Sequence, residues 1–344
     1  MPDFLHVLTD YFSCDLAIDL GSTNTLIYRK GCGIMVNEPT MVALERASRG
    51  PGSVIGAGTR AKELSAHYGN EVVILKPVQY GAVADLPAAR EMLHRYLAAT
   101  RSLFRREPRV IANAPARASR LEKDLIRQLI LSTGAREVYL IEEPRALALG
   151  AGLDLSEERY HMVVDIGGGI TEMAVMAEGK VVRAAALRTG GEQMDQAIAE
   201  YVKKQHRLLI DHHAAEQIKM QIGDACPGTA EKSLAVTGLY AAADMPGSVL
   251  VTAQEIRGAL SGTLAAIVNA IKAFLRALSP RQSVDILDGG IVLAGGTALL
   301  NNMDRLLERE LLYPFLKVKD PLTCLVRGSG DALEYLEHFR DCRK

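Results

Sequence analysis

The sequence has few cysteines, and they follow no metal-binding or disulfide pattern. No CxxC pair and no Cys/His spacing indicates a zinc site. An odd number of cysteines without a secretion signal is typical of a protein from a reducing compartment. The five cysteines are Cys14, Cys32, Cys226, Cys324 and Cys342.

Long apolar runs and an excess of either charge are also missing. No uncharged apolar run approaches the roughly 18 residues that would indicate a membrane span. The opening stretch "MPDFLHVLTDYFSCD" has no positively charged segment and no cleavage site, so we do not expect a signal peptide. Lys and Arg number 40 against 41 Asp and Glu, a balance that does not favour a nucleic-acid-binding protein.

Several common active-site motifs are absent. Neither GxxxxGK[ST] nor GxGxxG occurs, which argues against a P-loop and against a dinucleotide-binding Rossmann domain. HExxH and GxSxG are missing as well, so zincin and hydrolase functions have no support. The length of 344 residues instead predicts two lobes.

One sequence pattern is present twice. The stretch "LAIDLGSTNTLIYRKG" begins at Leu16, and "MVVDIGGGITEMAV" begins at Met162. In each, an apolar run leads to an aspartate (Asp19 or Asp165), small residues form a turn, and a second apolar run follows. Such an internal repeat, within a chain that alternates strands and helices, predicts a duplicated α/β core.

The alternating elements carry clear boundary signals. We expect hairpins from "LAIDL" with "NTLIYRK" and from "HMVVDI" with "TEMAVMAEGKVV", and strands at "PRVIANAP" and "EVYLIEEP". Helices should begin after Ser119 and Thr252, because a glutamate follows each at capping-box spacing. Pro280 is expected to end the second helix. A Gly-rich turn between a strand and a helix is expected in "GGIVLAGGTALLNNMDRLLEREL".

The glycine turns favour phosphate binding. A turn without side chains lets several backbone N–H groups point at one anion, and a side chain there would block the approach. An aspartate cannot hold a phosphate directly, but it can hold Mg²⁺, which bridges to phosphate oxygens. One such turn alone would more often be a structural turn. Two similar hairpins and a third turn, "LAGGTALL", make a nucleotide site the better interpretation.

Seven stretches together resemble the MreB family of bacterial actins, which organise the walls of rod-shaped cells. They run in order from about Asp15 to Glu337 and are "DLGSTNTLIY", "NEPTMVALE", "GAREVYLIEEP", "VVDIGGGITEMAV", "AAEQIKMQIG", "IVLAGGTALL" and "DPLTCLVRGSGDALE". The wider superfamily includes actin, chaperone ATPases and sugar kinases.

The resemblance implies an actin-like α/β fold in which two lobes enclose ATP and Mg²⁺ in a central cleft. The first lobe would comprise residues 1–145 and about 326–344, with a small subdomain at about 33–75. The second would comprise 146–325, with a small subdomain inserted at about 192–250.

The resemblance also implies a role for individual residues. Glu143 matches the glutamate that positions the attacking water, although a carboxylate there could instead cap the following helix. Asp19 and Asp165 match the metal-side aspartates. The nucleotide contacts would come from the first phosphate loop, the second phosphate loop, the ribose and adenine residues, and the adenosine loop. These are Asp19, Gly21, Ser22, Thr23 and Asn24; Gly167, Gly168 and Gly169; Glu216 and Lys219; and Gly295, Gly296 and Thr297.

Two positions depart from the family pattern. Ile170 stands where the family usually has a threonine that helps to orient the hydrolytic water, and an alkyl side chain cannot hydrogen-bond water. Thr297 stands where the family has a third glycine, and it is expected to add a side chain beside the base. The first departure puts hydrolysis in question, and the second puts the fit of the purine in question.

Two segments are candidates for membrane contact. "TRSLFRREPR" places Leu103 and Phe104 among arginines, which suits an anionic membrane surface and matches the family's membrane loop, although an ordinary basic loop explains it equally well. The N-terminal segment could form an apolar helix face, but its flanks are acidic and packing onto the body is the stronger alternative.

The sequence therefore favours an ATP-binding cytoskeletal protein that forms membrane-associated filaments of its own copies and hydrolyses ATP slowly. It would be cytoplasmic and peripheral at the inner membrane. Membrane-bound cell-wall synthesis proteins are candidate partners, and nucleic acid is not expected as one. One alternative is a nucleotide-bound scaffold with negligible turnover. The other is a soluble phosphotransferase or chaperone ATPase, which is disfavoured because no sugar-binding motif and no following substrate domain is evident.

Overall fold

The computed structural model describes residues 15–46, 52–68, 71–100, 107–227, 232–240 and 245–336. It divides into two compact units. Unit 1 comprises Met1–Glu157, Met176–Ala184 and Leu322–Lys344, and unit 2 comprises Glu158–Val175 and Ala185–Pro321. The first and last divisions fall after residues 157 and 321, whereas the sequence placed them after 145 and about 325. Residues 176–184, expected in the second lobe, belong to unit 1.

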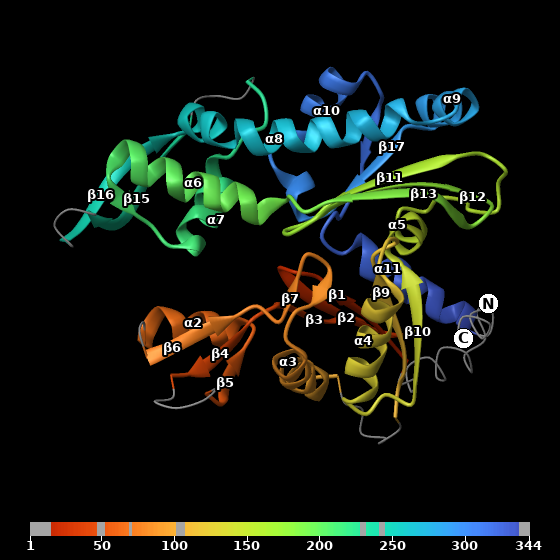
Figure 1. Ribbon diagram of the computed structural model, residues 1–344, viewed down its shortest axis with the longest axis horizontal. Helices are drawn as coiled ribbons and strands as arrows, with labels where there is room; N and C mark the ends of the chain where they lie inside the picture. Colours follow the sequence, from red (N-terminus) through yellow and green to blue (C-terminus); the bar gives the residue numbers. More distant parts are fainter. Residues whose placement is uncertain are drawn as a thin grey trace. The chain divides into compact units, whose positions relative to one another are not determined.

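Unit 1 is built on a five-stranded sheet with the strand order β10-β9-β1-β2-β3 (Figure 1). The hairpin expected from the first repeat is confirmed, because β1 and β2 pair antiparallel with Asp19 opposite Leu26. β9 lies parallel to both β1 and β10. The strands are β1 Leu16–Leu20, β2 Asn24–Arg29, β3 Gly33–Pro39, β9 Arg109–Ala114 and β10 Glu137–Glu142.

Helices complete the core of unit 1. The capping box predicted at Ser119 and Glu122 is present and opens α4. α5 follows β10 directly and packs against α11, which comes from the far end of the chain. The helices are α3 Leu86–Ala98, α4 Arg120–Leu131, α5 Glu143–Gly150 and α11 Cys324–Ala332.

A small sheet with the order β5-β4-β6 and the helix α2 lie within the stretch expected as the first small subdomain. A two-stranded ribbon, β7–β8, follows it along the chain. The elements are β4 Val42–Glu45, β5 Val54–Ala57, α2 Thr59–Tyr68, β6 Val72–Leu75, β7 Val78–Gln79 and β8 Ala82–Val83.

Unit 2 contains most of a second five-stranded sheet, with the order β13-β12-β11-β17-β18. The prediction of "TEMAVMAEGKVV" as one strand of the second hairpin is wrong, because this stretch forms two strands. The turn between them lies at Glu178 and Gly179, and both residues have positive φ, the left-handed conformation that reverses a chain tightly. The strands are β11 His161–Ile166, β12 Thr171–Ala177, β13 Lys180–Leu187, β17 Ile291–Ala294 and β18 Phe315–Lys317.

Two helices and a three-stranded sheet occupy the stretch expected as the second inserted subdomain. The strand order is β14-β15-β16. α6 and α7 pack against each other, and their apolar faces join the core of unit 2. The elements are α6 Gly191–His206, β14 Leu208–Leu209, α7 His212–Ile222, β15 Ser233–Tyr240 and β16 Met245–Thr252.

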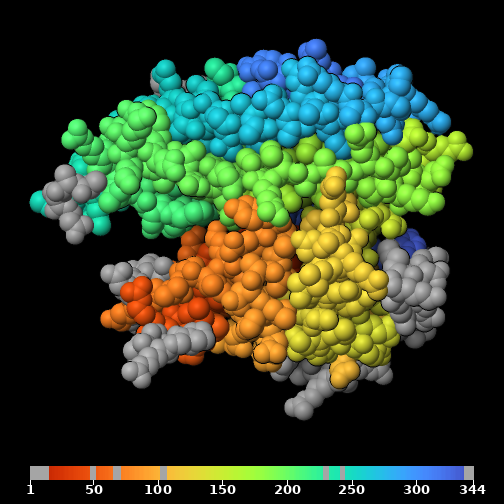
Figure 2. Space-filling model, in the orientation of Figure 1, coloured from red at the N-terminus to blue at the C-terminus, as the bar shows by residue number. Residues whose placement is uncertain are grey.

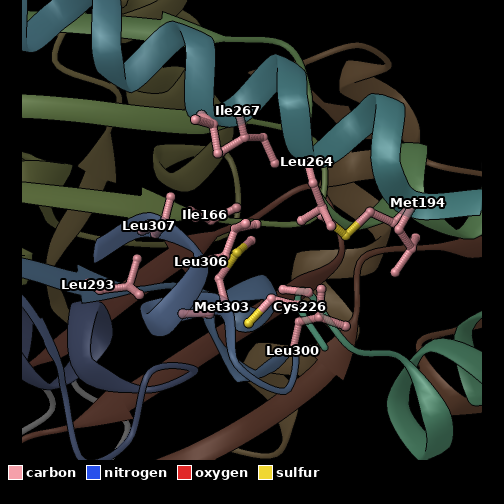
Figure 3. Close-up of a cluster of buried hydrophobic side chains, with 14 of the residues drawn as sticks. Ile166, Met194, Cys226, Leu264, Ile267, Leu293, Leu300, Met303, Leu306 and Leu307 are labelled. Carbon is pink, nitrogen blue, oxygen red and sulfur yellow. The ribbon is translucent and has the colours of Figure 1, made fainter. Parts of the chain in front are cut away.

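The longest described helix, α8 (Ala253–Arg276), supplies one wall of this core. Its predicted capping box at Thr252 and Glu255 is present. Figure 3 shows Leu264 and Ile267 of α8 pointing toward Met303 and Leu306 of α10 (Met303–Leu311). The helix is thus held by packing along one apolar face.

The expected role of Pro280 was wrong. α8 ends at Arg276, and Pro280 is the first residue of the next helix, α9 (Pro280–Gly289), after the N-cap Ser279. Proline is favoured at that position because the first helical N–H has no intrahelical partner.

By length and hydropathy, α8 is apolar enough to cross a membrane. Its apolar residues, however, are those that face the core, while its outer face carries small and polar residues such as Ser261, Ala265 and Asn269. That outer face is visible in cyan on the surface of unit 2 in Figure 2. Core packing therefore accounts for the composition of this helix.

Candidate functional site

The first glycine turn, in unit 1, is held by hydrogen bonds from other parts of the unit. Thr40 uses both of its donors here: Oγ1 donates to the Gly21 carbonyl at 2.7 Å, and its amide donates to the Thr23 carbonyl at 2.8 Å. The buried Ser22 hydroxyl accepts a hydrogen bond from the Gly81 amide at 3.1 Å. The backbone of the turn is thereby fixed before any ligand binds.

Close packing explains why this turn begins with glycine. A Cβ atom on Gly21 would lie 2.6 Å from the Asn24 carbonyl oxygen, which no side chain tolerates. Asp19 and Asn24 lie on β1 and β2 at the two ends of the turn. The five residues predicted for the first phosphate loop therefore span the end of β1, this turn and the start of β2.

Glu143 is the first residue of α5, at the point where β10 gives way to the helix. A carboxylate in a first helical turn is stabilised by the partial positive charge of the helix N-terminus. The N-cap residue is Glu142, and its side chain makes no capping hydrogen bond. Glu143 is partly exposed.

In unit 2, the carboxylate of Asp165 stands at the end of β11, opposite Ala294 of β17. Its Oδ1 is buried and has no hydrogen-bond partner among the described residues. Burial raises the pKa of this carboxyl to about 6. A buried anionic oxygen without a partner is costly, and a cation would relieve that cost.

Gly295 makes room for this carboxylate. Its backbone has φ +87, in the left-handed region, and a Cβ atom there would lie 2.2 Å from Asp165 Oδ1. Any other residue would collide with the carboxylate. The metal-side aspartate and the first glycine of the predicted adenosine loop are therefore direct neighbours.

The second glycine turn is tightened by a hydrogen bond from the Gly167 amide to the Ile170 carbonyl, 2.9 Å long. Its carbonyl groups are bound by the start of α6. The Gly191 amide donates to the Gly167 carbonyl at 3.0 Å, and the Glu192 amide donates to the Gly168 carbonyl at 2.8 Å. The N-terminus of α6 therefore anchors the loop.

This anchoring determines where the amides of the loop point. In a planar trans peptide, the C=O of one residue and the N–H of the next point in opposite directions. Because the Gly167 and Gly168 carbonyls face α6, the N–H groups of Gly168 and Gly169 face away from it. Across the described ranges, neither N–H group is paired with an acceptor. Two successive amides that point the same way are the arrangement found in backbone nests, which can bind an anion.

Lys219 and Glu216 lie one turn apart on α7. The Lys219 ammonium donates to the Gly191 carbonyl at 2.9 Å and lies 2.7 Å from Oδ1 of the buried Asp195. Burial raises the pKa of Asp195 despite the opposing effect of Lys219. Glu216 Oε2 lies 3.6 Å from His213 Nδ1. Lys219, itself a predicted nucleotide contact, thus binds two groups near the start of α6.

Sequence reasoning missed Asp195. It stands next to Met194 in α6, on the face that enters the core, and an aspartate on a buried helical face signals a paired or functional group. It also missed the glycine pair at 190–191. A Cβ atom on Gly190 would lie 2.4 Å from the Gly167 carbonyl oxygen, so α6 could not approach the loop with any other residue there.

The hydroxyl group next to Ile170 in the sequence, that of Thr171, is hydrogen-bonded to the backbone. The Thr171 hydroxyl is fully buried and donates to the Thr189 carbonyl at 2.8 Å. It is therefore not directed at a ligand. Ile170 itself is partly exposed and offers only an alkyl side chain.

No cluster of three or more His, Cys, Asp or Glu side chains that could hold a metal alone occurs within the described residues. A metal here would need oxygen ligands from the nucleotide and water besides Asp165. Leu103 and Phe104, the predicted membrane residues, lie outside the described residues, as does the N-terminal segment.

Comparison with known proteins agrees with these features. The model of the MreB/Mbl protein family matches residues 13–341. The cell shape-determining protein MreB of Escherichia coli (strain K12) is 42% identical over 329 residues, 95% of each chain. The cell shape-determining protein Mbl of Bacillus subtilis (strain 168) is 34% identical over 328 residues, 95% of this chain and 97% of that one.

Solved structures show the same fold. MreB5 of Spiroplasma citri bound to AMPPNP superposes with a TM-score of 0.88 at 26% identity, over 94% of this chain and 96% of that one. The MamK double helical filament gives a TM-score of 0.77 at 21% identity, over 93% and 99% of the two chains. The expected actin-like α/β fold is confirmed, and the chain belongs to the MreB/Mbl family.

Proposed function

We propose that the chain is an ATP-binding cytoskeletal protein that assembles into membrane-associated filaments and serves cell shape or cell-wall organisation. Its ATP would be bound with Mg²⁺ by the residues predicted from the sequence. Hydrolysis to ADP and phosphate would be slow. The observation that carries this proposal is the second glycine turn, whose Gly168 and Gly169 amides are aimed away from α6 and lack acceptors within the described ranges.

Solved structures of relatives support the proposal that this chain binds a nucleotide. The MreB5 structures of Spiroplasma citri are bound to AMPPNP and to ADP, at 26% identity to this chain. Both ligands carry an adenine and a polyphosphate, and the amide nest suits a phosphate oxygen. The first turn, anchored by Thr40, would supply further backbone donors.

The described residues also fit Mg²⁺. Asp165 offers a buried carboxylate oxygen without a partner, and the burial that raises its pKa disfavours the bare anion. A bound Mg²⁺ would neutralise phosphate charge. Asp165 would hold the ion directly or through water, and Asp19 is the second candidate on the metal side. Glu143 would accept a hydrogen bond from the attacking water.

Self-association is supported by the relatives rather than by contacts in this chain. MamK forms a double helical filament, and the MreB and Mbl relatives are cell shape-determining proteins. Copies of this chain would therefore be its first partners. Leu103 and Phe104, among arginines in the sequence, would place the filament on the inner face of the membrane, where cell-wall synthesis proteins are further candidate partners.

A second candidate function is a nucleotide-bound scaffold with negligible turnover. Ile170 provides no hydroxyl, and the Thr171 hydroxyl is committed to Thr189. If no other group orients the water, ATP would remain bound and the filament would persist.

The full chain with Mg-ATP, Mg-ADP or no nucleotide tests the proposal. We expect calorimetry to show binding of both nucleotides, and sedimentation with electron microscopy to show polymer that depends on ATP. Absence of nucleotide binding would overturn the proposed function. ATP hydrolysis by a chain that never sediments would instead support a soluble ATPase, and ATP-dependent polymer without phosphate release would support the scaffold.

A further inference from the structure

The side chain of Thr297 joins two glycine loops of unit 2. This residue lies in η2 (Gly296–Leu299), and only 6% of its surface is exposed. Its Oγ1 donates a hydrogen bond of 2.8 Å to the carbonyl of Gly167, which is 130 positions away in the sequence. The side chain was expected from the sequence to lie beside the base, and in the structure its hydroxyl contacts the second phosphate loop.

The Gly167 carbonyl therefore accepts two hydrogen bonds. One comes from the Gly191 amide at 3.0 Å and the other from the Thr297 hydroxyl at 2.8 Å. Both lone pairs of the oxygen are used, so the carbonyl cannot rotate away without losing a hydrogen-bond partner in a partly buried place.

The orientation of this carbonyl sets the orientation of a ligand-binding group. The Gly167 C=O and the Gly168 N–H belong to one planar peptide and point in opposite directions. Glycines resist such rotation poorly, because their backbone has no Cβ to restrict it. A hydroxyl that holds the carbonyl from one side therefore holds the amide toward the other.

We propose that Thr297 is a positioning residue for the nucleotide phosphates. Its hydroxyl holds the Gly167–Gly168 peptide so that the Gly168 N–H is presented to a phosphate oxygen before ATP arrives. This inference rests on the proposed function and deepens it. A glycine at position 297 would have no hydroxyl and could not make this contact, so the threonine preorganises the loop.

Two variants separate the hydroxyl from other properties of the side chain. Thr297→Ser keeps Oγ and loses only the methyl group. Thr297→Ala removes the hydroxyl without placing a new carbon against the Gly167 oxygen, which a valine would do. The Gly191 amide still binds that oxygen in both variants, so we expect a partial loss rather than collapse of the loop.

Affinities for ATP and adenosine, measured by competition against a fluorescent ADP analogue, test the phosphate role. We expect Thr297→Ala to bind Mg-ATP about 3- to 10-fold more weakly than Thr297→Ser, the loss typical of one hydrogen bond. Adenosine, which has no phosphate, should differ less than about twofold. Thr133→Ala, which removes a similar hydroxyl-to-carbonyl bond at the end of α4, is the matched control and should bind ATP as the parent does.

A second measurement does not depend on nucleotide. Hydrogen–deuterium exchange of a peptide covering 163–175 in the free protein should be faster in Thr297→Ala than in Thr297→Ser. Equal ATP affinity in these two variants, an equal loss for adenosine, or unchanged exchange would each overturn the positioning role. Failure of the parent to bind Mg-ATP would overturn the proposed function itself, which is a different result.

Discussion

At the scale of single residues, Asp165 combines a structural cost with a proposed ligand role. Its Oδ1 is buried and lacks a hydrogen-bond partner among the described residues. A side chain at position 295, where the chain has glycine, would collide with this oxygen. A group that is unfavourable in the empty protein and suited to a cation is typical of a binding site.

Asp165→Asn should weaken binding of Mg-ATP at least about tenfold, because an amide has a similar shape but no charge for the metal. Binding of ATP in the presence of a chelator should change much less. Calorimetry with and without Mg²⁺ measures both values. Equal Mg-ATP affinity in a folded Asp165→Asn protein would contradict the metal role.

The raised pKa of the Asp165 carboxyl predicts that the stability of the folded protein depends on pH. Its pKa is raised from 3.8 to about 6 in the folded protein, so the folded state binds the proton more tightly than the unfolded state does. The stabilising contribution of this carboxyl to the free energy of unfolding is therefore fully present below about pH 4. It is lost as the pH rises through about 6, and the total change in the free energy of unfolding is on the order of 1–3 kcal/mol.

Without nucleotide and metal, Asp165→Asn should consequently be more stable than the parent at pH 8, and the difference should shrink toward pH 4. Urea unfolding at several pH values measures this. A variant that is less stable than the parent at pH 8 would show that Asp165 has favourable partners that offset its burial.

At the scale of elements, the second glycine turn depends on what surrounds it. The start of α6 holds the Gly167 and Gly168 carbonyls, and Lys219 of α7 in turn holds the Gly191 carbonyl. Thr171 at the start of β12 ties this strand to Thr189. These contacts thus hold the backbone around the loop.

Ile170→Thr should raise the rate of ATP hydrolysis about 10- to 100-fold, which corresponds to about 1.4–2.8 kcal/mol of barrier. Under the proposed function, Glu143 accepts one hydrogen bond from the attacking water, and a threonine hydroxyl would supply a second. ATP affinity should change little, because backbone amides hold the phosphates. Single-turnover phosphate release on assembled polymer measures the rate.

Glu143→Ala is the companion variant and should abolish the hydrolysis that remains. If the parent already hydrolyses ATP as fast as Ile170→Thr, another group orients the water. The Thr171 hydroxyl is a poor candidate for that group, since it is buried and bonded to the Thr189 carbonyl.

At the scale of the whole molecule, assembly and location are the properties to test. The MreB/Mbl family and the actin-like fold make filaments the expected assembly, and α8 contributes to the core of unit 2 rather than serving as an evident anchor. Membrane contact is therefore predicted for the arginine-rich segment that contains Leu103 and Phe104.

Replacing both Leu103 and Phe104 by serine should reduce binding to anionic liposomes, because each apolar side chain contributes about 1.5–3 kcal/mol at full burial and less at an interface. Co-sedimentation with vesicles rich in phosphatidylglycerol measures the loss, and polymerisation without vesicles is the control. Equal co-sedimentation of variant and parent would exclude this segment as the anchor.

The sequence alone was sufficient for the features that depend on neighbouring residues. The first hairpin, both capping boxes and the Gly-rich turn before α10 were predicted, because turns without side chains and caps at fixed spacing are local requirements. The family was also recognisable, since its motifs run in order along the chain. The double strand β12–β13 was missed because no sequence breaker marks the turn at Glu178 apart from one glycine.

Only the tertiary structure decided what each side chain in the candidate site contacts. Thr297 bonds Gly167, Lys219 pairs with Asp195, and the start of α6 anchors the second glycine turn. These partners come from separate elements, and their meeting depends on how the helices pack on the sheet. A residue type sets which bonds a side chain can make, while long-range packing determines which bonds it does make.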